Sequence, residues 1–200
     1  MYHLRPAGWT AAIEEDEAME FDGKKSVITP EGVFIIGTYD ENGVPNAMNA
    51  AWGMQSDEGE ITLMLAAHKT TENFEKTGAF TVAFGTVDTM LISDYFSVET
   101  GKKVNKIEKA GCHVHKSAHV NAPIIEEYPL TLECKVKSWD PATGYVIGEI
   151  VASQADERIL TDGKVDLGKL KPIIFDPSFN AYRVVGEIVG SAFKDGLQLK

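Results

Sequence analysis

The residues best suited to chemistry in this chain of 200 residues stand in one short run: His68, Lys69, Thr70 and Thr71. They precede a polar segment, Glu72 to Lys76, that is typical of a helix and stops at Gly78, a common helix-ending residue. The start of a helix presents unpaired backbone N–H groups and the positive end of the helix dipole, so it favours a bound anion such as phosphate. The run therefore predicts an anion site, and it leaves open the simpler role in which Thr70 or Thr71 caps the helix.

Other reaction motifs are missing from the sequence. It contains no Gly-x-Ser-x-Gly, His-Glu-x-x-His or Gly-x-Gly-x-x-Gly pattern, which argues against the corresponding hydrolases and against a Rossmann nucleotide fold. Cys112, His113 and His115 are close in sequence, but a structural zinc site normally draws on two separated ligand pairs. We therefore predict neither a metal site nor a catalytic side chain.

Strand-like runs surround the anion run. Three precede it, at Val33 to Tyr39, Val44 to Met54 and Ile61 to Ala66, with turn residues at Asp40 to Gly43 and at Ser56 to Gly59. This pattern predicts a β-meander of three strands. Later strands are expected at Ala79 to Phe84, Pro129 to Trp139, Tyr145 to Ser153, Lys171 to Asp176 and Ala181 to Gly190.

Helical segments are few and short. Thr86 can cap a helix from Val87 to about Tyr95, and a single helical turn is expected between Val165 and Leu170. No repeat or linker divides the chain. We predict one mainly β domain over residues 1–200, with residues 1–26 as an N-terminal arm.

The composition limits the possible partners. A net charge of −11 and a pI near 4.9 argue against nucleic acid or an anionic membrane surface, and no apolar run is long enough to span a bilayer. Two cysteines, Cys112 and Cys134, are too few for a disulfide scaffold, and the N-terminus lacks signal-peptide features, so we expect a cytoplasmic protein. An anionic ligand would need local positive groups, for which Lys69 and Lys106 are candidates.

Several segments together resemble the flavin reductase-like family, and within it the flavoredoxin group. They are GTYDENGVPNAMNAAWG, TLML and HKTTENFEKTGAFTVAF, followed by ISDYFSVETGKKVNKIEKAG, NAPIIEEYPLTLECKV and VVGEIVGSAF. The resemblance covers roughly Thr29 to Phe193. It implies an FMN-binding split β-barrel that forms a homodimer, with the flavin at the subunit interface.

The resemblance also implies where FMN would bind. Asn46 to Trp52 would contact the flavin ring, with small residues for close approach, amides for its polar edge and an indole to wall the pocket. His68 to Thr71 would hold the phosphate, in a loop where family members commonly carry an arginine or similar basic residue; this chain has His68 and Lys69 there, which lack the guanidinium fork. The expected cofactor contacts are Asn46, Met48, Asn49, Ala50, Ala51, Trp52, His68, Lys69, Thr70, Thr71, Tyr95, Ser97 and Lys106.

Three functions are compatible with this resemblance. The first is an oxidoreductase that takes electrons from NAD(P)H onto FMN and passes them to free flavin or another small redox substrate. The second is a flavoredoxin-like electron carrier that docks a redox partner protein, and the third is a dimeric module without flavin chemistry. We favour the first, since a flavin needs only binding, orientation and electrostatics from the protein. The fold has no compact nicotinamide motif that would separate it from the second.

Overall fold

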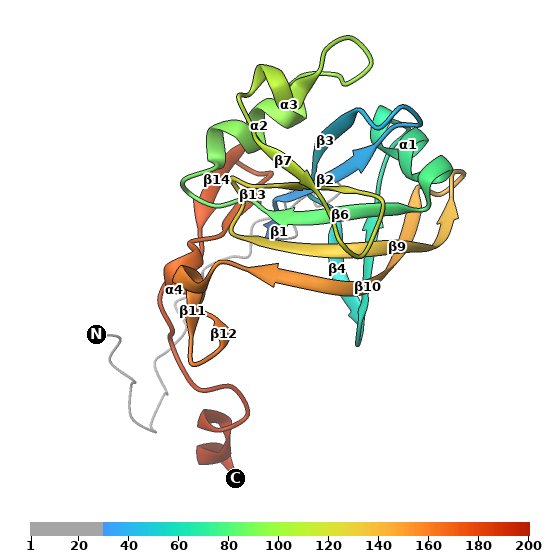
Figure 1. Cartoon of the computed structure of the whole chain (residues 1–200). Coiled ribbons are helices and arrows are strands. Elements are labelled where there is room, and N and C mark those ends of the chain that lie inside the picture. The colour runs from blue at the N-terminus through green and yellow to red at the C-terminus, as the bar shows by residue number, and fades with distance from the viewer. Residues whose placement is uncertain (1–29) are drawn as a thin grey trace.

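A curled, antiparallel seven-stranded sheet forms the centre of the computed structural model, which describes residues 30–200 (Figure 1). The strand order across the sheet is β3-β2-β6-β9-β10-β5-β4. These strands are β2 (Phe34–Tyr39), β3 (Pro45–Ala50), β4 (Gly53–Asp57), β5 (Glu60–Met64), β6 (Ala79–Phe84), β9 (Leu130–Asp140) and β10 (Tyr145–Ala155). The predicted hairpin of β9 and β10 is confirmed, as is the mainly β character. The expected arm at residues 1–26 lies outside the described residues.

The predicted three-stranded meander is wrong, because the run from Val44 to Met54 is two strands. β3 ends at Ala50 and β4 begins at Gly53, and these two strands lie at opposite edges of the sheet. Ala51 and Trp52 form a corner between them, held by a hydrogen bond from the Met64 N–H to the Trp52 carbonyl (2.9 Å). A Cβ at Gly53 would lie 2.3 Å from a methyl carbon of Leu63, so any other residue there would displace the Leu63 side chain at this close turn onto β5. The corner brings the two sheet edges together, which gives the sheet its half-barrel form.

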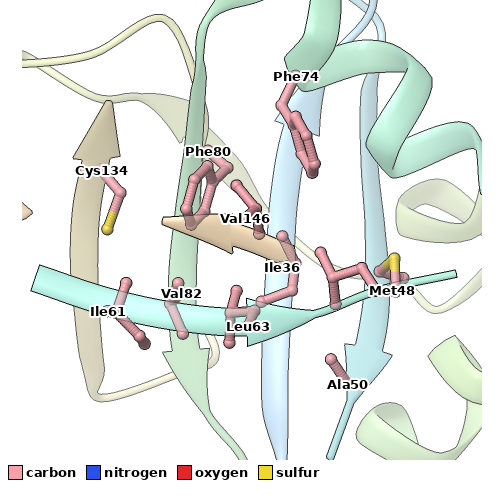
Figure 2. Close-up of a cluster of buried hydrophobic side chains, with 11 residues drawn as sticks. Ile36, Met48, Ala50, Ile61, Leu63, Phe74, Phe80, Val82, Cys134 and Val146 are labelled. Atoms are coloured by element: carbon pink, nitrogen blue, oxygen red, sulfur yellow. The ribbon is translucent and has the colours of Figure 1, made fainter. Parts of the chain in front are cut away.

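The interior of the half-barrel is a continuous hydrophobic cluster (Figure 2). Its buried members are Ile36, Met48, Ala50, Ile61, Leu63, Leu65, Phe74, Phe80, Val82, Cys134 and Val146. Phe74 comes from helix α1 (Lys69–Thr77), and its ring centroid lies 5.7 Å from that of Phe80 and 5.1 Å from that of Trp139. Helix α1 is therefore anchored to the sheet by one aromatic side chain, and its N-terminus takes a fixed position.

Two further helices lie along the chain between β6 and β9. Helix α2 (Met90–Val98) starts three residues later than predicted and ends later, while α3 (Lys106–Lys109) is a single turn. The late start arises because Thr86 and Thr89 form a turn, in which the Thr86 N–H donates to the Thr89 hydroxyl (2.9 Å). A second cluster, which includes Ile35, Ala47 and Phe96, packs α2 against the sheet.

The remaining elements form small sheets beside the main one. β1 (Glu31–Gly32), β13 (Ile173–Asp176) and β14 (Ala181–Val184) make a three-stranded sheet, so the last predicted strand ends at Val184 rather than Gly190. Two hairpins and short helices complete the described chain: β7 (Val114–Lys116) with β8 (Pro123–Ile125), β11 (Leu160–Thr161) with β12 (Lys164–Val165), α4 (Leu167–Leu170), and 3₁₀ turns at Glu157–Ile159 and Asp195–Leu199. Among residues 30–200, no helix is long and apolar enough to cross a membrane.

The cysteine and histidines of the 112–115 segment lie at the β7–β8 hairpin. The His113 Nδ1 contacts Glu127 (2.9 Å) and the His115 Nδ1 contacts Glu126 (3.2 Å), so the two imidazoles face separate carboxylates. Within the described part of the chain, no three His, Cys, Asp or Glu side chains are arranged to hold a metal ion. Cys112 is half-buried, and neither it nor Cys134 forms a disulfide.

Candidate functional site

A cavity of about 390 Å³ opens beside the edge strand β3. Its walls are β3, the N-terminus of α1, and the segment that runs from the end of α2 to the start of α3. Because β3 has a sheet neighbour on one side only, helices and loops contact its other edge, and the cavity lies among them.

The run of four polar residues forms the first turn of α1. His68 is the N-cap residue with an extended backbone, so the helix begins at Lys69, three residues earlier than predicted. Neither threonine is the N-cap residue, but Thr71 takes part in capping from position N3, as in a capping box. Its hydroxyl accepts from the His68 N–H and donates to the His68 carbonyl, both at 2.9 Å. Helical hydrogen bonding starts with the Glu72 N–H to His68, which leaves the preceding N–H groups without an acceptor inside the helix.

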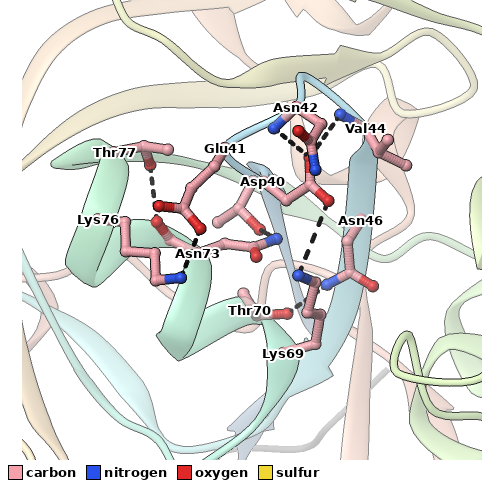
Figure 3. Close-up of polar contacts among 11 residues, drawn as sticks. Asp40, Glu41, Asn42, Val44, Asn46, Lys69, Thr70, Asn73, Lys76 and Thr77 are labelled. Atoms are coloured by element: carbon pink, nitrogen blue, oxygen red, sulfur yellow. Dashed lines mark hydrogen bonds and ion pairs between the residues drawn. The ribbon is translucent and has the colours of Figure 1, made fainter.

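A buried amide joins this helix start to β3 (Figure 3). The Asn46 Nδ2 donates to the Thr70 hydroxyl (2.7 Å), and both side chains are buried. The other amide atom, Asn46 Oδ1, is buried without a hydrogen-bond partner in the part of the chain that the structure describes. Leaving such an acceptor unpaired costs about 1–3 kcal/mol, so this oxygen is suited to receive a hydrogen bond from a bound molecule.

Backbone from the opposite wall approaches the same amide. A Cβ at Gly101 would lie 2.0 Å from the Asn46 Oδ1, so no other residue fits there without displacement. Lys102, next in the chain, pairs with Glu72 of α1 and ties this wall to the helix. The 99–103 segment is therefore held across the cavity by contacts to both β3 and α1.

Lys106 is a buried cation in the cavity wall. Its side chain is 3% exposed, and its Nζ donates to the Phe96 carbonyl (2.9 Å) at the end of α2. Burial lowers the pKa of Lys106 to about 8, while the Glu99 carboxylate acts in the opposite direction. Lys106 thus fixes the end of α2 relative to α3 and places positive charge behind the cavity.

Lys69 supplies a second, more accessible charge. Its Nζ lies 3.8 Å from the Asp40 carboxylate, at the rim of the cavity (Figure 3). The pKa of Asp40 is lowered, first by its hydrogen bond from the Val44 N–H and also by Lys69. With Lys103, the lining contains three lysines against one acidic side chain, Glu99. The site is positive although the whole chain carries −11.

The structure brings together most of the predicted cofactor contacts. Those that line the cavity are Asn46, Met48, Asn49, His68, Lys69, Thr70, Ser97 and Lys106. They come from β3, α1, α2 and α3, segments separated by up to 60 positions in the sequence. The resemblance assigned the β3 residues to the flavin ring and the α1 residues to the phosphate. The fold places both sets, together with Ser97 and Lys106, around one cavity.

The other five predicted contacts do not line this cavity. Ala50 points into the half-barrel core, and Ala51 and Trp52 form the corner between β3 and β4. The hydroxyl of Thr71 closes the helix turn, and Tyr95 packs against the cluster between α2 and the sheet. Ala50 and Tyr95 thus pack in the protein interior, and Ala51 and Thr71 shape turns of the backbone. The fifth residue, Trp52, has a side chain that is about half exposed at the corner.

Six lining residues were not predicted: Phe96, Val98, Glu99, Thr100, Gly101 and Lys103. Ending α2 at Tyr95 concealed the first two, since the observed helix continues to Val98. The basic stretch from Gly101 to Gly111, unusual in so acidic a chain, was the available signal for Gly101 and Lys103. Its Asn105 caps α3 by accepting from the Glu108 N–H (3.2 Å).

The chain is similar to a known domain family and to solved structures. A family model described as the flavin reductase like domain matches residues 27–169. The flavoredoxin of Desulfovibrio vulgaris (Miyazaki F) is 31% identical, with a TM-score of 0.85 over 89% of this chain and 99% of that one. The flavoredoxin from Methanosarcina acetivorans is 28% identical, with a TM-score of 0.81 over 92% of this chain and 100% of that one.

More distant similarities agree on the fold. An FMN-binding domain of flavin reductases-like enzyme from Shewanella baltica is 19% identical, with a TM-score of 0.72 over 82% of this chain and 91% of that one. An uncharacterized curated protein from Halalkalibacterium halodurans is 26% identical over 52% of this chain. The match spans 54% of that relative, about half of its length.

Proposed function

The chain belongs to the flavin reductase-like domain family, which makes it a flavin-related oxidoreductase or electron carrier, and from this premise we propose that it binds FMN in the cavity beside β3. The phosphate would lie at the first turn of α1, near Lys69 and Thr70. The ribityl chain and the ring would extend between β3 and the 99–103 segment.

The observation that carries this proposal is the unpaired, buried Asn46 Oδ1 inside a positively charged cavity. This oxygen can accept a hydrogen bond from a hydroxyl or imide group of FMN. The Lys69 ammonium and the free N–H groups at the start of α1 can bind an anion, such as the phosphate of FMN. Gly101 lets the opposite wall approach this amide closely, because a Cβ there would lie 2.0 Å from the Asn46 Oδ1.

FMN, when bound, supplies the redox chemistry, and the protein binds and orients it. Asn46, held by Thr70, would accept a hydrogen bond and fix one polar group of the ligand. Lys106 would contribute positive potential from behind the wall without leaving its place on the Phe96 carbonyl. No side chain has to act as an acid or a base in this scheme.

We propose further that NAD(P)H is the electron donor and that free flavin or another small molecule is the acceptor. Family membership supports this proposal. Stopped-flow mixing of the FMN-loaded protein with NADH, and separately with NADPH, should bleach the flavin absorbance faster than with free FMN.

The similarity to two flavoredoxins favours a second candidate, an FMN electron carrier that docks a redox protein. In that case bleaching by NADH and NADPH would be no faster than with free FMN. A chemically reduced sample would still pass its electrons on to a redox protein. The same stopped-flow experiment therefore separates the two candidates.

We also propose a homodimer that covers the open side of the cavity. Leu91 and Val98 lie two helical turns apart on α2, so they share one face, and both are exposed. An exposed apolar stripe beside a cofactor site is a common interface. Light scattering on the FMN-loaded protein should give the mass of two chains, and a flavin-loaded monomer would contradict it.

The free cysteines support a reducing compartment, which we take to be the cytoplasm.

Titration provides the test of cofactor identity. The fluorescence of FMN should be quenched on binding, and FMN should bind with higher affinity than FAD, because the N-terminus of α1 walls the cavity at the proposed phosphate position and the sequence has no dinucleotide motif. Protein that is colourless and leaves FMN fluorescence unchanged would refute the proposal.

A further inference from the structure

A tyrosine of the small three-stranded sheet reaches helix α2. The hydroxyl of Tyr182, on β14, donates to the Oδ1 of Asp94 on α2 (2.9 Å), although the two residues are 88 positions apart. The ring of Tyr182 packs on Phe175, its register partner on β13, with 6.1 Å between the ring centroids. These strands lie next to α2 (Figure 1). The contact therefore ties the last strands of the chain to the helix whose end walls the cavity.

Asp94 belongs to the turn of α2 that meets the cavity. The carbonyl of Ser93, just before it, accepts from the Asn49 Nδ2 (3.0 Å). The hydroxyl of Ser97, one turn later, donates to the Asp94 carbonyl (2.6 Å). Asn49 and Ser97 both line the cavity. The position of Asp94 therefore determines where α2 meets these two lining residues.

The amide of Asn49 has one orientation. A carbonyl accepts hydrogen bonds and cannot donate them, so the NH₂ group of the amide faces Ser93 and its Oδ1 points away from Ser93. Within residues 30–200 no hydrogen bond reaches this oxygen, and it is accessible rather than enclosed. A bound molecule can therefore donate a hydrogen bond to it.

Asn49 and Asn46 contact the site from two sides of the same strand. Side chains alternate along a strand, so the two asparagines point to opposite faces of β3. Asn46 is tied to α1 through Thr70, and Asn49 is tied to α2. Three residues along a strand span about 10 Å. Asn49 thus lies away from the proposed phosphate position at the start of α1, at the end where the flavin ring would lie.

The hydroxyl of Tyr182 keeps its proton at neutral pH. Burial, and then the Asp94 carboxylate, raise the pKa of Tyr182 to about 12, while the side chains of Ser97 and Asn49 act in the opposite direction. Tyr182 is therefore a steady donor to Asp94, and the two lining residues lie beside its hydroxyl.

We propose that Tyr182 is a positioning residue of the flavin site: its hydroxyl, bound to Asp94, holds α2 so that Asn49 accepts a hydrogen bond from the flavin ring. The inference rests on the proposed binding of FMN beside β3. Tyr182 itself does not line the cavity, so it acts on the ligand only through α2 and Asn49. The ring carries an imide N–H, a donor that the Asn49 oxygen can accept.

Two pairs of variants test the contact from its two ends. Tyr182→Phe removes the hydroxyl and keeps the ring on Phe175, and Tyr145→Phe is its matched control, because Tyr145 is a half-exposed tyrosine of β10 that does not line the cavity. Asp94→Ala removes the acceptor, whereas Asp94→Asn keeps an acceptor oxygen and should restore the contact. Circular dichroism checks that each variant folds.

Calorimetric titration with FMN and with riboflavin measures the effect. Tyr182→Phe and Asp94→Ala should weaken both ligands by roughly fivefold, as loss of one hydrogen bond does, because the contact acts at the ring that both ligands share. Asp94→Asn and Tyr145→Phe should bind both ligands as tightly as the original chain. The visible absorbance band of the bound flavin should shift in the first two variants only, since it reports a changed hydrogen bond to the ring. An unchanged affinity in Tyr182→Phe, or an equal loss in Tyr145→Phe, would overturn the inference.

A double-mutant cycle shows whether Tyr182 acts through Asn49. Asn49→Ala should weaken both ligands, and adding Tyr182→Phe to it should cause no further loss, because the oxygen to be positioned is already gone. Losses that add would contradict the proposed role, as would an Asp94→Asn chain that binds no better than Asp94→Ala. A changed mass of Tyr182→Phe in light scattering would also contradict it, since the hydroxyl would then act at a subunit contact.

The same titrations keep this inference apart from the proposed function. An original chain that binds neither FMN nor riboflavin refutes the flavin site, and the positioning role falls with it. An original chain that binds FMN no more tightly than Tyr182→Phe refutes the positioning role alone.

Discussion

Replacing Lys69 by methionine tests the phosphate end of the site most directly. The side chain is 31% exposed and its ammonium lies 3.8 Å from Asp40, so methionine keeps the aliphatic stem and removes only the charge. A charge-assisted hydrogen bond contributes about 1.5–3 kcal/mol, and partial exposure places Lys69 at the low end. A loss of about 1.4 kcal/mol corresponds to a roughly tenfold weaker FMN complex.

Thr70→Ala extends the same test. The hydroxyl of Thr70 already accepts from Asn46, so its own proton is available for a phosphate oxygen. Its removal takes away this hydrogen bond to the phosphate, which adds a further loss of FMN binding of about 1.5–3 kcal/mol. The double variant Lys69→Met/Thr70→Ala should therefore bind FMN on the order of 100-fold more weakly than the original chain.

Riboflavin binding shows whether the loss of FMN affinity comes from the phosphate contact alone. It has the ring and the ribityl chain without the phosphate, so calorimetric titration of Lys69→Met should show its affinity unchanged. Lys76→Met is the matched control, because Lys76 sits in the last turn of the same helix, pairs with Glu41 (2.6 Å) and does not line the cavity. If FMN and riboflavin weaken equally in Lys69→Met, or if Lys76→Met weakens FMN as much, the phosphate does not lie at the α1 start.

Three other variants test the packing, the shape and the charge of the site. Phe74→Ala should lower the free energy of unfolding in urea by about 3–5 kcal/mol, because the ring is fully buried in the half-barrel core; a loss near that of a surface change would contradict this. Gly101→Ala should weaken FMN and riboflavin equally in titration, since the new methyl group meets Asn46 at 2.0 Å, and an unchanged affinity would show that the 99–103 segment moves freely. Lys106→Met removes the buried charge of the wall. Burial lowers the pKa of Lys106 from 10.5 to about 8 in the folded chain. Between these two values the unfolded chain binds more protons, so the stability of the original chain rises with pH. Urea unfolding at pH 7.5 and 9.5 should show the original chain gaining stability relative to Lys106→Met, and parallel curves would refute the lowered pKa.

Local turn chemistry made much of the fold predictable. The hairpin of β9 and β10 follows from alternating strands around a turn that ends in Gly144, and the end of α1 follows from Gly78. The helix starts were less predictable. His68 is an uncommon cap, and Thr86 closes a turn before α2 begins, so both helices were misplaced by a few residues. Such errors arise where a polar side chain has two possible backbone partners, because sequence does not show which one it bonds.

The corner at Ala51 and Trp52 could not be predicted from its neighbours in the sequence. Apart from Gly53, the run from Val44 to Met54 has the pattern of one long strand, and the break depends on pairing of β4 with β5 while β3 pairs with β2. This long-range choice also creates the site. Since β3 ends at the corner and keeps an open edge, α1 and the 99–103 segment can reach Asn46 there, where a neighbouring strand would otherwise lie. Asn46 and Thr70 belong to one site because the sheet curls, and sequence alone connected them only through resemblance to a family.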